Sequence, residues 1–121
     1  MTHPKVSKLN QPRAIPAGQG KIIEEYVGQT SNGLRSLSVA HMVAPPGWGE
    51  PWQQPEFHEV TIVLRGQLSI ESDHNVIVLG PGEIALAQPG ARVRYSNPFD
   101  EESEYWAICS PAFSIAGAGR D

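Results

Sequence analysis

Short apolar runs separated by turn residues recur along most of the chain. The runs are too short for long helices, and no window keeps the 3.6-residue periodicity of an amphipathic helix. Runs of this length and spacing predict an all-β protein of short antiparallel strands, arranged as a sandwich or a barrel. The predicted strands occupy residues 21–27, 34–43, 57–64, 67–71, 76–79, 83–87, 92–96 and 104–109.

The distribution of strand and turn signals divides the chain into three segments. Residues 1–20 contain three prolines and little periodicity, which predicts an N-terminal arm. Residues 21–113 hold the predicted strands and form the β-barrel domain. Residues 114–121 are rich in glycine and alanine, and we expect them to form a flexible C-terminal tail.

The strand predicted over residues 57–64 carries the most informative acidic residue. Alternation places Glu59 on one face with Thr61 and Val63, and places His58 on the other face. Both faces are largely apolar, so Glu59 is expected to point inward. An isolated buried carboxylate is costly, and partial loss of hydration would raise its pKa to a value suited to proton transfer. The alternative is a paired glutamate kept for its hydrogen bonds.

Two further side chains are candidates for the same chemistry. His41 shares its parity with Val39 and Val43, the face expected to look inward. The sequence therefore predicts His41 as a pocket residue, either a ligand or a general base, with an imidazole bonded to the backbone as the alternative. Tyr95 is expected to project into the same interior. The candidate catalytic residues are thus Glu59, His41 and Tyr95.

Aromatic and amide side chains cluster in the loop before residue 57 and in the last predicted strand. Trp52 and Trp106 are expected to wall an apolar cavity, with Gln53 and Gln54 supplying amide contacts. Such a lining is typical of a small-molecule site. The alternative is that these aromatic residues are ordinary core.

Two motifs in this order resemble the cupin family. The first begins at Glu59 and reaches Gly66 after six residues. The second, residues 82–97, begins with a glycine and an acid, passes a proline–glycine corner and ends at an asparagine. The likeness covers residues 34–109. It implies a cupin-like jelly-roll barrel, a double-stranded β-helix, that commonly forms a homodimer.

The resemblance also implies where a metal would be held, because cupin sites usually take three histidines and the glutamate. In this chain other residues take the histidine positions, which are Gln53 with Pro55 or Trp52 with Gln54 in the first motif, and Val93 in the second. The usual cupin site is therefore largely absent. The cofactor is left open by the sequence. A divalent metal, if one binds, is expected to use Glu59 with His41 or His58, completed by amide or water ligands.

Composition and charge limit the binding partners and the cellular compartment that we expect. The chain has 121 residues, enough for one domain, and its formal net charge is −4 without a basic cluster. We therefore expect no nucleic acid partner and, since no long apolar run is present, no membrane partner. A polar N-terminus and the lone Cys109, expected to be a buried small residue, favour the cytoplasm.

Together these features predict a small-molecule-binding, cupin-like protein. One hypothesis is an enzyme of the lyase or isomerase type, which transfers a proton at an interior site of glutamate and histidine. The alternative is a non-catalytic ligand-binding or sensor cupin. The expected partners are a small organic molecule and, from the resemblance, a second copy of the chain.

Overall fold

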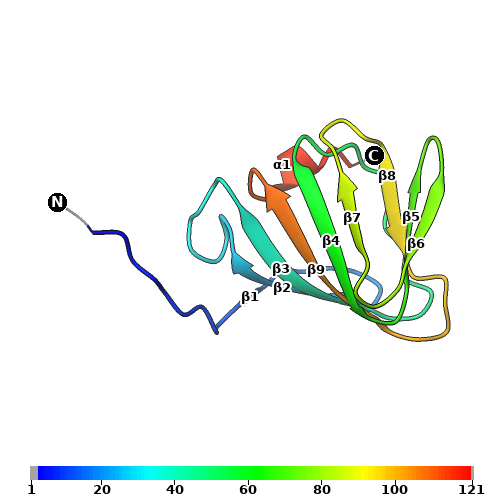
Figure 1. Cartoon of the computed structure of the whole chain (residues 1–121), viewed down its shortest axis with the longest axis horizontal. Coiled ribbons are helices and arrows are strands. Elements are labelled where there is room, and N and C mark those ends of the chain that lie inside the picture. Colours follow the sequence, from blue (N-terminus) through cyan, green and yellow to red (C-terminus); the bar gives the residue numbers. More distant parts are fainter. Residues whose placement is uncertain (1–2, 121) are drawn as a thin grey trace.

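The computed structural model describes residues 3–120, and nearly all of its regular structure is β-strand (Figure 1). The all-β class predicted from the sequence is confirmed. The elements are β1 (Arg13–Ala14), β2 (Ile22–Val27), β3 (Ser38–Ala44), β4 (His58–Arg65), β5 (Leu68–Ser72), β6 (Val76–Leu79), β7 (Ile84–Ala87), β8 (Val93–Ser96), β9 (Ser103–Ser110) and the short helix α1 (Ile115–Ala118).

The strands form two antiparallel sheets. The larger sheet has the order β1-β2-β3-β9-β4-β7, and the smaller has the order β6-β5-β8. β9 lies between β3 and β4, with Ala107 opposite Ala40 on one side and opposite Thr61 on the other. The last strand therefore pairs with two strands that come much earlier in the chain, and the two sheets face each other as a jelly-roll barrel (Figure 1).

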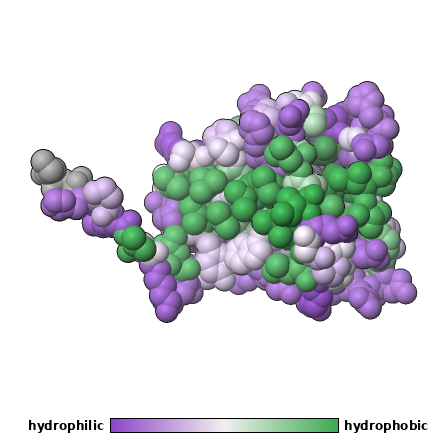
Figure 2. Space-filling view, in the orientation of Figure 1, coloured by the Kyte–Doolittle hydropathy of each residue, from purple (hydrophilic) through white to green (hydrophobic). Residues whose placement is uncertain are grey.

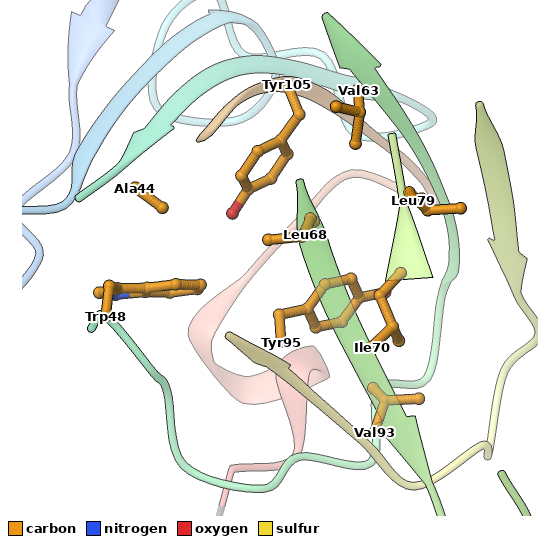
Figure 3. Close-up of a cluster of buried hydrophobic side chains, with 9 residues drawn as sticks. All are labelled: Ala44, Trp48, Val63, Leu68, Ile70, Leu79, Val93, Tyr95 and Tyr105. Carbon is orange, nitrogen blue, oxygen red and sulfur yellow. The ribbon is translucent and has the colours of Figure 1, made fainter. Parts of the chain in front are cut away.

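Alternation along β9 shows how the sequence fills the barrel. Ser103, Tyr105, Ala107 and Cys109 are buried, and the residues between them are partly exposed. Tyr105 joins a core that draws on both sheets and on the loop after β3 (Figure 3). The buried members of this core are Ala44, Trp48, Val63, Leu68, Ile70, Leu79, Val93, Tyr95 and Tyr105.

Two residues of the cupin-like motifs hold corners of the barrel. Gly66 has φ +73°, and a Cβ at this position would overlap the carbonyl oxygen of Glu102. The buried side chain of Asn97 donates hydrogen bonds to the carbonyl oxygens of Ala44 (3.1 Å) and Glu101 (2.8 Å). Both residues therefore serve the fold.

Both terminal segments take part in the structure. Residues 3–12 extend away from the barrel, whereas β1 pairs with β2 and residues 15–19 reach the barrel interior (Figure 1). In the segment predicted as a tail, the backbone carbonyls of Gly117 and Gly119 accept from Glu56 N (2.8 Å) and Gln54 N (2.9 Å). Residues 1–2 of the predicted arm and residue 121 of the predicted tail lie outside the described residues.

The outer face of the larger sheet is unusually apolar. Leu64, Ile84 and Leu86 are 44%, 61% and 59% exposed. Figure 2 shows a hydrophobic area across the face that carries β4 and β9. Within residues 3–120, no helix is long and apolar enough to cross a bilayer.

Candidate functional site

A cavity of about 230 Å³ lies inside the barrel. It is lined by the inward side chains of β2, β3 and β9, by the loop before β4 and by the C-terminal segment. Ala40 and Ala107, which are opposite each other in the sheet, leave room for it because their side chains are small. Sites for drug-sized ligands measure about 300–1,000 Å³, so this cavity suits a smaller organic molecule.

Lys21 places a cation inside this cavity. The side chain is 8% exposed, and its Nζ donates a 2.7 Å hydrogen bond to the Tyr105 hydroxyl. The same nitrogen lies 3.5 Å from the centre of the Trp48 ring, a cation–π contact. Burial lowers the pKa of Lys21 to about 8, although Glu50 and Glu59 act in the opposite direction. Figure 3 shows the Tyr105 hydroxyl and the Trp48 ring that hold it.

Glu59 faces the same cavity from β4. Loss of hydration raises the pKa of Glu59 to about 7, and the carboxylate of Glu50 adds to the rise. Lys21 and Arg120 oppose it because their positive charges favour the ionised form. A carboxyl group with this pKa exchanges a proton readily near neutral pH.

A second carboxylate and a second cation meet at Gln53. The Gln53 Nε2 donates to Glu50 Oε1 (2.6 Å), and Arg120 Nε donates to Gln53 Oε1 (3.4 Å). Burial raises the pKa of Glu50, whereas Lys21 and Arg120 lower it. The cavity is therefore lined by three acidic residues, Glu25, Glu50 and Glu59, and by two basic ones, Lys21 and Arg120.

Tyr95 brings a hydroxyl group to the cavity from β8. The hydroxyl is buried, and within residues 3–120 it has no partner in hydrogen-bonding geometry. Burial and the charge of Glu59 raise its pKa well above the ordinary value, with the nearby Thr61 hydroxyl opposing the rise. The phenol therefore stays protonated and is available as a donor to a ligand.

His41 lies on the outer face of the larger sheet, so the inward orientation expected from the alternation is wrong. Its Nε2 is 2.6 Å from Glu104 Oε2, its Nδ1 is 3.8 Å from Glu24 Oε1, and its ring packs edge-on against Trp106. Trp106 is on the same outer face and does not line the cavity either. The apolar neighbours that suggested an interior face cover the outside of the barrel.

The other residues predicted for ligand or metal binding are spread over different places. Gln53 lines the cavity, but Gln54 Nε2 donates to the Gly90 carbonyl (2.9 Å) and Trp52 stacks with Arg92. His58 is exposed at the start of β4. Glu59, His41 and His58 are not brought together, and residues 3–120 contain no group of three or more His, Cys, Asp or Glu side chains that could hold a metal.

The positions that the resemblance assigns to metal ligands do not fit a metal. The Gln53 amide is already bonded to Glu50 and Arg120, and Val93 is packed in the apolar core. The ammonium group of Lys21 lies in the cavity that a metal would share, and two cations repel each other there. The chemistry available at this site is therefore that of its own side chains.

Sequence reasoning missed Lys21, Glu50 and Arg120. Lys21 carried a usable signal, since it shares its parity with Ile23 and Glu25, and all three line the cavity. Glu50 and Arg120 had none, because a loop and the C-terminal segment bring them to the site.

Comparisons with known proteins agree with this architecture. Residues 40–109 match the family model described as a cupin domain. A curated Myxococcus xanthus (strain DK1622) protein named endoribonuclease YbeY is 45% identical over 106 residues, which is 88% of this chain and 36% of that protein. This chain thus spans about a third of that relative's length.

Two solved structures show the same fold. A mutant of Bacillus subtilis oxalate decarboxylase OxdC has a TM-score of 0.79 at 15% identity, covering 98% of this chain and 33% of that one. A cupin 2 conserved barrel domain protein from Salinispora arenicola CNS-205 has a TM-score of 0.67 at 16% identity, covering 97% and 94%. At such identities the likeness is one of fold alone.

Proposed function

The chain belongs to the cupin domain family, and we propose that it binds a small organic molecule in the barrel cavity and transfers a proton on it, as a lyase or an isomerase does. The observation that carries this proposal is Glu59, a carboxyl group with a pKa of about 7 inside the 230 Å³ cavity. Such a group can accept a proton from a ligand carbon and return it elsewhere.

The neighbouring groups have complementary roles in this proposal. The Lys21 ammonium, positioned by Tyr105 and Trp48, stabilises negative charge that develops on a ligand oxygen when a proton leaves carbon. The Tyr95 hydroxyl donates a hydrogen bond to a second ligand oxygen. Phe113 and Ile115 of the C-terminal segment add apolar surface to the cavity wall. His41 has no part in this step, because it faces outward.

Proton exchange tests the proposal. The protein is incubated in deuterium oxide with a panel of small oxo acids and hydroxy acids, and loss of their C–H signals is followed by NMR. We expect exchange that Glu59→Gln slows by about 100-fold or more. Glu101→Gln, at an exposed glutamate in the loop before β9, is the matched control and should exchange like the wild type.

Equal exchange rates in wild type and Glu59→Gln would contradict the proposal. Ligands that raise the melting temperature without any exchange would instead favour the alternative, a non-catalytic ligand-binding or sensor cupin. The ribonuclease name of the Myxococcus relative is not carried into the proposal, because this chain spans 36% of that protein. A net charge of −4 also offers little to an RNA backbone.

We further propose that two copies pair through the outer faces of β4 and β7. Leu64, Ile84 and Leu86 supply exposed apolar area, and Arg65 and Glu102 place both signs of charge beside it. A twofold-related copy would meet this face with the same groups reversed, which makes it self-complementary. Light scattering should give twice the chain mass for wild type.

A matched pair of variants tests which face is used. Leu86→Lys should give a monomer, whereas Val76→Lys, at an equally exposed position on β6, should leave the dimer intact. A monomeric wild type would contradict this proposal.

A further inference from the structure

Lys21 differs from every other lysine of the chain. The sequence has three lysines, and Lys5 and Lys8 lie in the exposed arm. Lys21 is buried in the cavity wall, where its ammonium contacts the Tyr105 phenol and the face of Trp48. Glu50 and Glu59 act on it through charge attraction without being its direct hydrogen-bond partners. Burial of a lysine in this setting costs folding free energy, and a function of its amine would explain why the cost is borne.

We propose that Lys21 is a nucleophile that forms an imine with a small oxo acid bound in the cavity, whose carboxylate is held by Arg120. This inference rests on the proposed function and names its substrate class. Three groups that line the same 230 Å³ cavity support it. Lys21 supplies the amine, Glu59 can donate and accept protons, and Arg120 can bind the carboxylate of the ligand.

The chemistry balances within the site. The lone pair of Lys21 Nζ adds to the carbonyl carbon of the oxo acid, and the resulting carbinolamine loses water. A C=N bond forms and the C=O bond breaks, while the carbonyl oxygen leaves as water with the two hydrogens that the neutral amine carried. Glu59 can shuttle these protons between nitrogen and oxygen, and the Tyr105 phenol contacts the reacting nitrogen. No oxidant or reductant is needed.

Burial prepares the amine for this step. A nucleophilic lysine must be neutral, and in an apolar pocket the neutral form is favoured. The pKa of Lys21 is lowered to about 8, so much more of its amine is neutral at physiological pH than for a lysine in water. Once formed, an imine acidifies the adjacent C–H bond, which is the proton that Glu59 is proposed to remove.

Arg120 is the group proposed to bind the carboxylate of the ligand. It lines the cavity from the C-terminal segment, where its Nε donates to the Gln53 side chain (3.4 Å). A guanidinium has five N–H donors, so others remain for a carboxylate. With the neutral Lys21 amine at the carbonyl carbon and the Arg120 guanidinium at the carboxylate, an oxo acid matches both basic groups of the cavity. On such a ligand the imine nitrogen takes over the charge-stabilising role that the proposed function gives to the Lys21 ammonium.

Reductive trapping tests the inference on the wild-type protein. Pyruvate and sodium cyanoborohydride are added near neutral pH, and the modified lysines are located by peptide mass spectrometry. Lys5 and Lys8 are internal controls in the same chain, and the N-terminal amine is read from a separate peptide. We expect Lys21 to be modified at least about tenfold faster than either arm lysine. The advantage should vanish in urea.

Two variants and an uncharged probe complete the experiment. Lys21→Arg should abolish trapping at this position. Arg120→Gln should slow trapping by pyruvate at Lys21 far more than trapping by butanone, a ketone without a carboxylate, because loss of the Arg120 charge raises the pKa of Lys21 equally for both probes. Modification of Lys21 no faster than Lys5 and Lys8 would overturn the inference.

The two proposals fail separately. Proton exchange that depends on Glu59, without trapping at Lys21, would support the proposed function and contradict the imine. Trapping at Lys21 without any proton exchange would support the reactive lysine and contradict the proposed proton transfer.

Discussion

The Glu59 carboxyl group should make the folded chain less stable as the pH rises, and Glu59→Gln should remove this penalty. Loss of hydration in the cavity raises the pKa of Glu59 from 4.5 to about 7. The folded chain therefore binds this proton more tightly than the unfolded chain does. The stability that the proton contributes is complete below pH 4.5 and is lost as the pH rises through about 7.

The size of the effect follows from the same pKa. Each tenfold change in a protonation equilibrium is worth about 1.4 kcal/mol. Moving the pKa of Glu59 from 4.5 to about 7 thus makes its ionisation cost about 3 kcal/mol more in the folded state. Most of this falls between about pH 5 and pH 7.5, where the linkage relation gives about 2 kcal/mol.

The titration of Lys21 sets the upper pH limit for measuring the effect of Glu59 on stability by itself. Its pKa is lowered from 10.5 to about 8, so its charged form is the one that burial disfavours. The folded chain therefore regains stability as the pH rises from about 8 towards 10.5, the opposite sense to Glu59. Measurements kept below about pH 7.5 separate the two groups.

Urea denaturation followed by tryptophan fluorescence gives the free energy of unfolding at each pH. The difference between Glu59→Gln and wild type cancels the contributions of groups that titrate alike in both chains. We expect the variant to gain about 2 kcal/mol relative to wild type between about pH 5 and pH 7.5. Glu101→Gln should show no such trend. A difference that does not change with pH would refute the view that Glu59 is a desolvated acid.

Three other results are expected. Cys109 should resist iodoacetamide in the folded chain and react after unfolding, because burial raises its pKa well above the ordinary value; rapid labelling of the native protein would contradict this. Gly66→Ala should lower the free energy of unfolding by more than about 2 kcal/mol in urea denaturation, since a Cβ overlaps the Glu102 carbonyl, whereas Gly82→Ala, with a similar φ and open space, should cost about 1 kcal/mol. His41→Ala should leave proton exchange and Lys21 trapping unchanged in the assays above, and a loss comparable to that of Glu59→Gln would place His41 in the chemistry after all.

Local pattern reasoning works where one face of a strand is clearly distinct. Gly66 and Asn97, which belong to the motifs that carry the cupin resemblance, lie at corners of the barrel, where a positive φ and a buried amide are needed. Alternation also fits β4, where Glu59 faces the cavity and His58 does not.

The same reasoning fails on β3, and the cause is physical. Alternation separates two faces but does not say which one is inside unless one of them is polar. On β3 the outward face carries Val39 and Val43 beside His41, within the apolar outer surface, and the inward face includes the small Ala40. The more apolar face was therefore the outer one.

The amino-acid sequence by itself determined the all-β class and the inward position of a glutamate, because strand periodicity and turn chemistry act over a few residues, and its resemblance to the cupin family implied the jelly-roll barrel. Only the tertiary structure decided what surrounds that glutamate. Lys21, Glu50 and Arg120 come from the start, the middle and the end of the chain, and meet because β9 joins β3 to β4 within the larger sheet and the C-terminal segment folds back on the loop before β4. The pKa values of Lys21 and Glu50 depend on their burial and on the charges that surround them, which no local stretch of sequence encodes.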